Sequence, residues 1–383
     1  MDNFGITATT LYGLEDILSE ELRQLGARDI EVLNRAVRYK GNIELLYKSN
    51  LMLRTAVKIL KPIISFRAFD ETQLYDNIKT IDWDQYFGTE DTFAIDGSVN
   101  GEIFTHSKYV ALKSKDAIVD QFRDKYNIRP DVDAEFPDVR INVHISNDIV
   151  NVSLDSSGNI LSKRNYRLNQ TEASMNEVLA AGIIILSGWD KNCDFIDPMC
   201  GSGTLAIEAA LMALNIPPGR NRSFGFETWK DFDKELWNKI LAEADQQINK
   251  INCKIYARDI DYKSLKVAKL NAERAGVSEY IEFKEMDFFQ SEYDGEKAVV
   301  IINPPYGERI EVDEIIDFYK DMGTRLKHFY PGCNAWVISS NSDALKHFGL
   351  RPTRKIKLFN GPLECKLHKY ELYRGSKRDA YAS

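Results

Sequence analysis

Hydrophobic and polar positions near the start of the chain follow helical and strand periods in turn. Leucine and isoleucine repeat at helical spacing over 14–25, which predicts an amphipathic helix with one buried face. Strands are expected over 4–9 and 30–32, and a second helix over 43–49. The segment 1–64 is therefore predicted to form a small α/β unit.

A second small unit, of α+β type, is predicted over 65–155. A helix is expected over 107–127, because Ile118, Val119 and Phe122 fall on one face. The opposite face of this helix carries the lysines Lys108, Lys113 and Lys115. That basic face suits contact with phosphates, and it suits an ordinary solvated helix surface equally well.

Short apolar strands alternate with helices from residue 169 to the end of the chain. This alternation predicts a parallel, doubly wound sheet. Asn360-Gly361 separates two alternating runs and predicts a hairpin at the sheet edge. The polar stretch 156–168 is expected to be a linker, and 215–253 a long polar excursion within the last domain. The predicted fold class is α/β, with domains over 1–64, 65–155 and 169–383.

Length and composition support several folded domains. The 383 residues exceed what one hydrophobic core usually supports, and 44% hydrophobic with 28% charged residues excludes a disordered chain. No apolar run approaches the roughly 20 residues needed to cross a bilayer. Early acidic residues take the place of a signal sequence, so a cytoplasmic location is expected.

Cysteine usage and charge narrow the possible functions further. The five cysteines show no C-x-x-C spacing and the five histidines show no clustering, so neither a disulfide framework nor a metal site is expected. Fifty Lys plus Arg against 58 Asp plus Glu give a net charge of -8, which argues against indiscriminate coating of nucleic acid. A local basic face remains compatible with this balance.

A glycine-rich loop is the sharpest local signal. Asp197-Pro-Met-Cys-Gly-Ser-Gly-Thr204 follows a short apolar strand and opens a helix. Gly201 and Gly203 let the backbone turn sharply and approach a ligand, and the helix start offers unpaired N–H groups. The same sequence also suits a purely structural turn.

Two acids follow the next predicted strand. They lie much further from the glycine loop than the roughly 20 residues that separate the glycines from the acid in a dinucleotide-binding site, so the sequence argues against dinucleotide binding. Asp259 suits a ribose diol, because a carboxylate accepts from both hydroxyls. Asp261 is better placed to cap the following helix.

A second motif, Ile301-Ile-Asn-Pro-Pro-Tyr-Gly307, follows a buried strand. The side-chain oxygen of Asn303 and the carbonyl of Pro304 are acceptors, Pro305 stiffens the loop, and Tyr306 offers an aromatic face. Two acceptors and a ring are what the exocyclic amino group of a planar base requires. A plain strand-ending turn is the structural alternative.

Together the two motifs resemble the cofactor loop and catalytic loop of the amino-group methyltransferases that use S-adenosylmethionine. The stretches 116–133 and 137–167 resemble the THUMP-containing RNA guanine-N2 methyltransferases of the RlmL and YpsC types. In that family a ferredoxin-like and a THUMP domain precede a Rossmann-like methyltransferase domain, and the resemblance covers essentially the whole chain. Arg164-Asn165-Tyr166 departs from the expected Arg-Gly-Tyr, which puts a glycine-dependent turn in doubt.

The resemblance implies direct methyl transfer to guanine N2 in RNA, with 23S rRNA favoured over tRNA. The catalytic loop contains no cysteine, so no covalent enzyme intermediate is implied. Methylation of adenine N6 in DNA is an alternative, because Asn-Pro-Pro-Tyr serves any planar amino group. A module that binds S-adenosylmethionine or a nucleotide without catalysis is another.

The resemblance also assigns contacts. Asp197 would hold the methionine amino group, Asp287 would accept from the adenine amino group, and Phe288 would stack on adenine, although core packing is expected for at least one of Phe288 and Phe289. The implied cofactor contacts are Asp197, Pro198, Cys200, Gly201, Gly203, Thr204, Asp259, Asp287 and Phe288. The implied RNA contacts are Lys108, Lys113, Lys115, Lys163, Arg164, Arg167, Arg220 and Arg222. The aromatics Phe224, Phe226 and Trp229 would line the entrance for the base.

Overall fold

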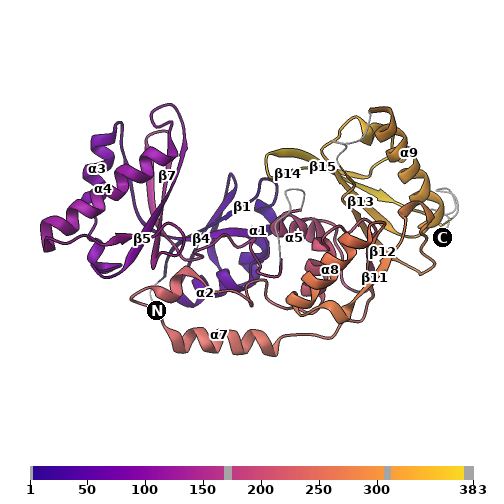
Figure 1. Ribbon diagram of the computed structural model, residues 1–383, viewed down its shortest axis with the longest axis horizontal. Coiled ribbons are helices and arrows are strands. Elements are labelled where there is room, and N and C mark those ends of the chain that lie inside the picture. Colours follow the sequence, from indigo (N-terminus) through magenta and orange to yellow (C-terminus); the bar gives the residue numbers. More distant parts are fainter. Residues whose placement is uncertain (1–2, 168–174, 306–311, 375–383) are drawn as a thin grey trace. The chain divides into compact units, whose positions relative to one another are not determined.

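The computed structural model describes residues 3–167, 175–305 and 312–374 (Figure 1). Tertiary contacts divide the chain into two compact units, each built from segments that are not contiguous in sequence. The first unit comprises Met1–Thr10, Ser19–Leu161 and Arg222–Glu243. The second comprises Leu11–Leu18, Ser162–Asn221 and Ala244–Ser383.

The first unit is organised around one sheet of order β2-β3-β1-β4-β8-β7-β5-β6. Its strands are β1 (Phe4–Thr10), β2 (Arg28–Leu33), β3 (Ala36–Gly41), β4 (Ala56–Arg67), β5 (Thr92–Asn100), β6 (Asp131–Val132), β7 (Val139–Ser146) and β8 (Ile149–Asp155). The helices of this part of the sequence are α1 (Glu15–Gln24), α2 (Ile43–Met52), α3 (Glu71–Lys79) and α4 (Ser107–Tyr126). In Figure 1, α3 and α4 lie side by side along β5 and β7.

The two small domains predicted over 1–64 and 65–155 share this sheet. β4 pairs with β1 on one side and with β8 on the other, both antiparallel. The sequence pattern did not predict β4 or β3. Pro62 lies inside β4, where the register shifts between Pro62 and Ile64, so the alternation that marks a strand is broken.

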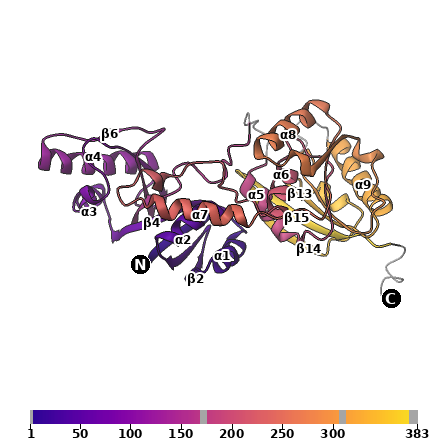
Figure 2. The same ribbon diagram turned by 90° about the horizontal axis from the view of Figure 1, so that it is seen from below.

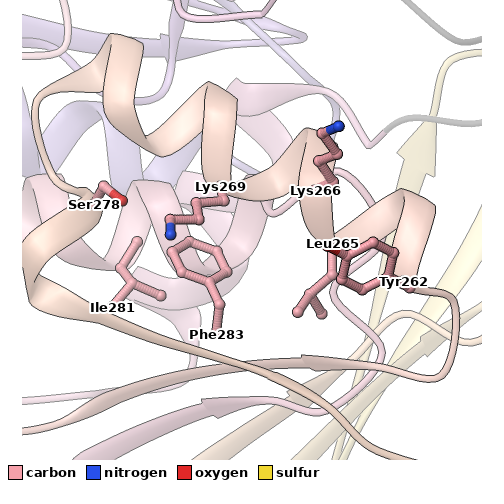
Figure 3. A pocket seen from close by; sticks show the side chains of 7 residues that line it. All are labelled: Tyr262, Leu265, Lys266, Lys269, Ser278, Ile281 and Phe283. Carbon is pink, nitrogen blue, oxygen red and sulfur yellow. The ribbon is translucent and has the colours of Figure 1, made fainter.

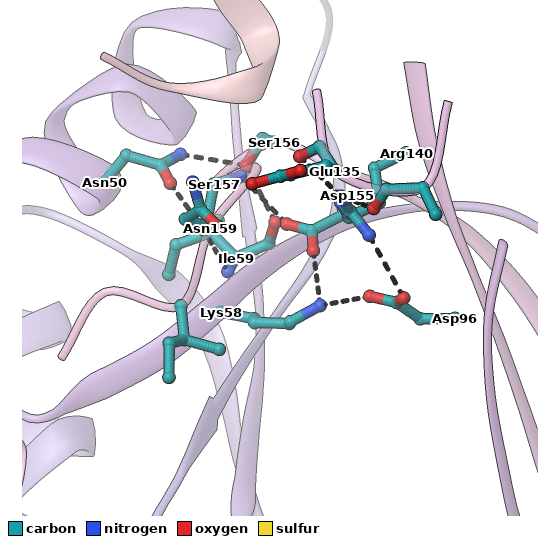
Figure 4. Close-up of polar contacts among 12 residues, drawn as sticks. Asn50, Lys58, Ile59, Asp96, Glu135, Arg140, Asp155, Ser156, Ser157 and Asn159 are labelled. Carbon is teal, nitrogen blue, oxygen red and sulfur yellow. Dashed lines mark hydrogen bonds and ion pairs between the residues drawn. The ribbon is translucent and has the colours of Figure 1, made fainter. Parts of the chain in front are cut away.

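A network of charges connects β4, β5, β7 and β8 (Figure 4). The ammonium of Lys58 lies 2.7 Å from a carboxylate oxygen of Asp96 and 2.7 Å from one of Asp155. Arg140 lies 3.2 Å from Asp96 and also donates to the carbonyls of Ala134 and Glu135. Asp155 is fully buried. The charges are compensated within the network, which a buried carboxylate requires.

The segment 222–243 packs in the first unit, although the sequence placed it within the methyltransferase domain. The rings of Tyr47 and Phe226 stack with centroids 4.2 Å apart. Trp237, from α7 (Lys234–Gln246), packs edge-on against Phe226 at 5.1 Å. Burial of aromatic rings is strongly favourable. The segment 222–243, which was predicted to be polar, therefore supplies core residues to the first unit.

The second unit contains a seven-stranded sheet of order β11-β10-β9-β12-β13-β15-β14. Its strands are β9 (Asp194–Asp197), β10 (Ile255–Asp259), β11 (Ile281–Glu285), β12 (Ala298–Ile302), β13 (Asn334–Ser339), β14 (Arg354–Asn360) and β15 (Leu363–Glu371). Its helices include α5 (Glu177–Leu186), α6 (Thr204–Ala213), α8 (Tyr262–Ala275) and α9 (Val312–Phe329). Strands β9 to β13 pair in parallel, and β15 and β14 add an antiparallel edge.

Helices cover this sheet as the strand–helix alternation predicts. α5, α6 and α8 lie next to one another (Figure 2). α9 packs Tyr319, Met322 and Leu326 into a buried cluster with Val300 and Val337 of the sheet. The predicted hairpin is confirmed, with Gly361 at φ +60° in its turn. Within the described ranges, no helix has both the length and the apolar character that a bilayer crossing needs.

Candidate active site

The two sequence motifs follow neighbouring strands of the second sheet. β9 ends at Asp197 and β12 ends at Ile302, and these strands pair in parallel with Ile196 opposite Val300. The carboxyl ends of parallel strands meet at the same edge of a sheet, so the glycine loop and Asn303 begin at the same edge. A ligand at this edge can contact both loops.

The glycine loop has the backbone that its sequence demands. Gly201 and Gly203 adopt φ values of +52° and +82°. A Cβ added at Gly203 would lie 2.9 Å from the Cβ of Ala268, whereas one added at Gly201 would meet nothing within 4 Å. Gly203 precedes α6 without a side-chain cap hydrogen bond. The loop therefore leaves open space at Gly201 beside the start of a helix, where N–H groups suit a ligand's carboxylate.

Asp197 carries a buried carboxyl group at the start of this loop. It is 1% exposed, and neither oxygen has a hydrogen-bond partner of normal geometry within the described part of the chain. Burial, followed by the negative charge of Asp259, raises the pKa of the Asp197 carboxyl well above its usual range, and the backbone amides of Met199 and Ala206 offset only part of this. A buried carboxyl with so few donors suits the cationic group of a ligand.

The acids that follow β10 have separate roles. Asp259 accepts from the backbone N–H of Gly201 at 2.8 Å and from that of Asp261 at 2.9 Å, one on each oxygen. It therefore ties the glycine loop to β10, and each oxygen keeps a lone pair for a hydroxyl. Asp261 caps α8 by accepting from the N–H groups of Lys263 and Ser264, which confirms its predicted role.

Other loop residues are less available to a ligand. Thr204 is 4% exposed and its hydroxyl accepts from Arg167 at 2.8 Å, so its side chain is held in the protein. Pro198 is buried. Burial raises the pKa of the Cys200 thiol, and Cys200 is 7% exposed, so it is a small buried loop residue, as the sequence indicated.

The catalytic motif is described as far as Pro305. Asn303 is half-buried directly after β12, Pro304 is buried and Pro305 is exposed. Tyr306, predicted to stack on the base, lies outside the described residues. The Asn303 side chain and the Pro304 carbonyl thus begin a loop at the same sheet edge as Asp197.

Asp287 and the two phenylalanines after it follow β11. The Asp287 carboxylate accepts from the backbone N–H of Phe289 at 2.9 Å. Phe288 is 3% exposed and lies in the core, its ring 6.0 Å from that of Tyr330. Phe288 is therefore the core residue of the pair, and its burial argues against the predicted stacking on adenine. Phe289 is the half-buried ring.

Sequence reasoning missed Ile260. Its side chain is 68% exposed between Asp259 and Asp261, at the carboxyl end of β10. An aliphatic residue flanked by two acids in a strand-ending loop was the available signal. Its exposure places an apolar surface next to the proposed ribose-binding carboxylate.

The predicted RNA contacts at Arg164 and Arg167 are wrong. Arg164 is 3% exposed and its guanidinium lies 3.7 Å from Glu208. Arg167 lies 2.8 Å from Glu177 and donates to Thr204. Buried ion pairs occupy both guanidinium groups, because partners distant in sequence meet them in the fold. Lys163 is exposed.

The turn put in doubt by Asn165 is preserved. Asn165 adopts φ +65°, a left-handed conformation that asparagine tolerates better than most residues. Its amide donates to the carbonyl of Asn221 at 3.2 Å, and its own carbonyl accepts from Arg274 at 3.3 Å. These bonds hold a turn that glycine would otherwise make.

The structure argues against the predicted base entrance, while an RNA contact at the exposed Arg220 stays a prediction. Arg220 pairs with Asp245 through two nitrogens, at 2.8 and 3.2 Å. Arg222 donates to the carbonyls of Ser157, Asn159 and Ile160, so it holds a turn of the first unit. The associated aromatics Phe224, Phe226 and Trp229 are buried at 4%, 0% and 6% exposure, and none is open to a base.

The lysines of α4 fit their predicted surface position. Ile118 and Phe122 are fully buried, while Lys108 is exposed. Lys113 is half-buried with its ammonium 5.0 Å from the ring centre of Tyr75, and Lys115 pairs with a neighbouring aspartate. Of these three, Lys108 is the most open to a phosphate.

Family models match three successive parts of the chain. Residues 5–60 match the RlmL ferredoxin-like domain, residues 68–155 the THUMP domain, and residues 164–369 the RMKL-like methyltransferase domain. These matches follow the domain order that the resemblance implied.

Three similar proteins cover nearly all of the chain. A Synechocystis sp. protein, provisionally named an RNA methyltransferase, is 39% identical over 96% of both chains. The ribosomal RNA large subunit methyltransferase K/L of Syntrophotalea carbinolica is 37% identical over 95% of this chain, which spans about half (53%) of that relative. The crystal structure of SMU.472, provisionally described as a methyltransferase and complexed with SAH, has a TM-score of 0.88 at 31% identity and covers 98% of this chain and 100% of its own. The chain therefore belongs to the THUMP-containing, RMKL-like RNA methyltransferases.

Proposed function

We propose that this chain transfers a methyl group from S-adenosylmethionine to the exocyclic N2 amino group of a guanine in RNA, with 23S rRNA as the favoured substrate. One observation carries the proposal: the glycine loop with its buried Asp197, and the Asn303 loop, leave the carboxyl ends of two neighbouring parallel strands. The name of the Syntrophotalea relative supports a large-subunit rRNA substrate.

The residues around the glycine loop fit the cofactor. S-adenosylmethionine supplies an electrophilic methyl group on a sulfonium centre. The Asp197 oxygens have no hydrogen bond of normal geometry within the described chain, and the amides of Met199 and Ala206 offset their burial only in part, which suits the cofactor's ammonium group. The open space at Gly201 admits the methionine part, and Asp259 keeps acceptors for ribose hydroxyls. Ile260 offers apolar surface for the adenine ring.

Asn303 and Pro304 would prepare the nucleophile. The guanine N2 lone pair is conjugated into the ring, so the nitrogen is a poor nucleophile. The Asn303 side-chain oxygen and the Pro304 carbonyl would accept the two amino hydrogens and localise that lone pair. The guanine nitrogen would gain the new N–C bond as the S–C bond of the bound cofactor breaks, and one amino proton would then pass to water. Such positioning is worth roughly 7 to 11 kcal/mol of the barrier.

The test is the Asn303→Ala variant of the full chain. We expect SAH affinity to stay within about twofold, while the rate of methyl transfer falls by about 10² to 10³, as for loss of one preorganised polar contact. Calorimetry measures the first and transfer of radiolabelled methyl to RNA the second. Asn192→Ala, an exposed asparagine of the same unit, is the control and should leave both unchanged.

Nucleoside mass spectrometry identifies the target. We expect N2-methylguanosine in 23S rRNA treated with the protein, and its absence from that rRNA in a deletion strain. If N2-methylguanosine appeared only in tRNA, the substrate would be tRNA and not 23S rRNA. N6-methyladenine in DNA with unmodified RNA would overturn it, as would wild-type and Asn303→Ala proteins that bind SAH and modify nothing.

A further inference from the structure

A shallow hollow of about 380 Å³ lies between α8 and β11 in the second unit (Figure 3). Its apolar floor is formed by Leu265, Ile281 and Phe283. Tyr262, Lys266, Lys269 and Ser278 also line it. In Figure 3 the ammonium of Lys269 points toward the apolar residues, whereas that of Lys266 points away from them. No carboxylate lines it. We call it the α8–β11 hollow.

Most of the hollow lies away from the glycine loop, although Tyr262 at the start of α8 follows Asp259 and Ile260 of the proposed cofactor site. β11 is an edge strand, and β10 lies between it and β9, which carries Asp197. Two lining residues, Ser278 and Ile281, lie just before and at the start of β11. The glycine loop, by contrast, leaves the carboxyl ends of the strands. The proposed cofactor contacts therefore border the hollow at Tyr262 and do not account for its other end at Ser278 and Ile281.

Two lysines give the hollow a positive charge. Neither Lys266 nor Lys269 forms an ion pair with any residue in the ranges that the structure describes. The stretch from Tyr262 to Asn271 contains three lysines and no acid, while Asp261 precedes it and Glu282 and Glu285 are exposed on β11. In a chain of net charge -8, a free cationic face of this kind is a local concentration of charge, which steers anions.

Aromatic surface lies next to these cations. Tyr262 is 63% exposed and Phe283 is half-buried. In Figure 3 the ammonium of Lys269 lies beside the ring of Phe283, and Tyr262 lies beside Leu265 at the other end of the hollow. Proteins that bind single-stranded nucleic acid use positive charges to contact the phosphates and aromatic rings to stack on the bases.

We propose that the α8–β11 hollow binds one nucleotide of a single-stranded segment of the RNA substrate, outside the catalytic site. Lys266 and Lys269 contact its phosphates, and its base packs against Tyr262 and the apolar floor. The volume lies at the lower end of the range for small-ligand sites, which fits one nucleotide. This inference rests on the proposed function for the identity of the ligand.

The first test reverses the two charges in the full chain. Fluorescence anisotropy with a labelled oligouridylate 12-mer should show roughly tenfold weaker binding for K266E/K269E at low salt, and a salt slope reduced by about 0.7 for each lysine lost. With the RNA substrate, KM should rise while kcat and SAH affinity stay unchanged. The control K320E/K327E changes two exposed lysines of α9 by the same charge and should lose much less affinity.

The second test concerns the ring. Tyr262→Ala should weaken binding of the 12-mer roughly tenfold. Tyr262→Phe should retain it, because the structure gives the Tyr262 hydroxyl no hydrogen bond within the described residues. Photocrosslinking of a 4-thiouridine 12-mer, followed by peptide mass spectrometry, should label the peptides that contain Tyr262 or Phe283.

Several outcomes overturn the inference. Equal weakening by K266E/K269E and K320E/K327E would show only a diffuse charge effect. Crosslinks confined to other segments would exclude the hollow as an RNA site. Binding of ATP, or of a labelled oligoglutamate, that K266E/K269E abolishes while the 12-mer still binds would assign a free nucleotide or an acidic peptide. A wild-type protein that methylates RNA, with unchanged KM in K266E/K269E, would sink this inference and leave the proposed function intact.

Discussion

The protein compensates the burial of the Asp197 carboxyl group only in part. Burial and the charge of Asp259 raise its pKa in the folded chain. A carboxyl whose folded pKa exceeds its unfolded value binds protons more readily when folded. The free energy of unfolding of the ligand-free protein should therefore fall as pH rises above about 4, the ordinary aspartate value. A bound ammonium group would reverse this penalty.

The variant Asp197→Asn tests that reasoning. Without ligand it should be at least as stable as the wild type at pH 7 to 8, because it removes a buried carboxylate of similar volume. With SAH, the wild type should gain thermal stability and Asp197→Asn should gain little. Thermal melts with and without SAH, between pH 5.5 and 8.5, measure both effects. Asp294→Asn, at an exposed position, is the control; a large SAH-induced shift in Asp197→Asn would refute the assignment.

Single residues also show which roles can be predicted from the sequence and which cannot. Asp261 was predicted as a helix cap because its role depends only on the next few residues. Arg164 and Arg167 were misread because their partners Glu208 and Glu177 are brought near only by folding. A glutamate in the otherwise apolar stretch TLAIEAALMA was the one available hint, since a buried acid needs a cation.

At the scale of elements, the glycine loop and α6 make a contrast that mutation can test. In Gly203→Ala a Cβ would lie 2.9 Å from Ala268 at φ +82°, so we expect about 1 to 3 kcal/mol of lost stability from strain. In Gly201→Ala the Cβ meets no protein atom, so the stability loss should be about 1 kcal/mol. That Cβ would occupy the space assigned to the methionine part, so SAH affinity should fall more than tenfold.

Denaturation and calorimetry on the two variants separate these effects. Gly188→Ala supplies the matched control, because its φ of +70° also lies in open space and it is outside the loop. It should lose similar stability to Gly201→Ala and keep its SAH affinity. Unchanged affinity in Gly201→Ala would mean that the ligand does not pass this residue.

Elements with a strong local pattern were predicted, and elements defined by distant packing were not. The helices over 14–25 and 107–127 and the final hairpin follow from periodicity and turn residues. α7 was missed as part of the first unit, because a polar stretch with scattered aromatics does not reveal that Tyr47 provides their packing surface. At the site, the strand–loop–helix context of both motifs was predictable from the sequence. Ile260 could be assigned to the site only once the structure showed that its side chain is exposed.

At the scale of the molecule, a charge network should make the stability of the first unit depend on pH. The first unit has the Lys58 network in its sheet. Burial raises the pKa of Asp96, but the hydrogen bonds and charges of Lys58 and Arg140 outweigh it and leave that pKa lowered. The stability that Asp96 contributes is therefore present above about pH 4 and is lost as pH falls below that. Although burial alone would lower it, Asp155 and Asp96 raise the pKa of Lys58. The stability that Lys58 contributes is therefore lost only as pH rises above the ordinary lysine pKa. Between these limits the network should be fully charged at Lys58 and Asp96.

Removing Lys58 should expose the cost of burying Asp155. Burial already raises the pKa of Asp155, and Lys58 opposes that shift. Lys58→Met leaves a buried carboxylate without its cation, which should cost about 3 to 5 kcal/mol at pH 8. The cost should shrink toward pH 5 as Asp155 takes up a proton. Lys61→Met, on the same strand with an exposed partner, should cost about 1 kcal/mol or less.

Chemical denaturation at pH 5 and pH 8 measures these costs, and hydrogen exchange in peptides of β4 and β8 assigns them to the first unit. Lys58→Met/Asp155→Asn should recover most of the lost stability, because no charge is then buried alone. A loss in Lys58→Met that is the same at both pH values, and that the double variant does not recover, would mean that packing of the lysine stem stabilises this sheet and the ion pair does not.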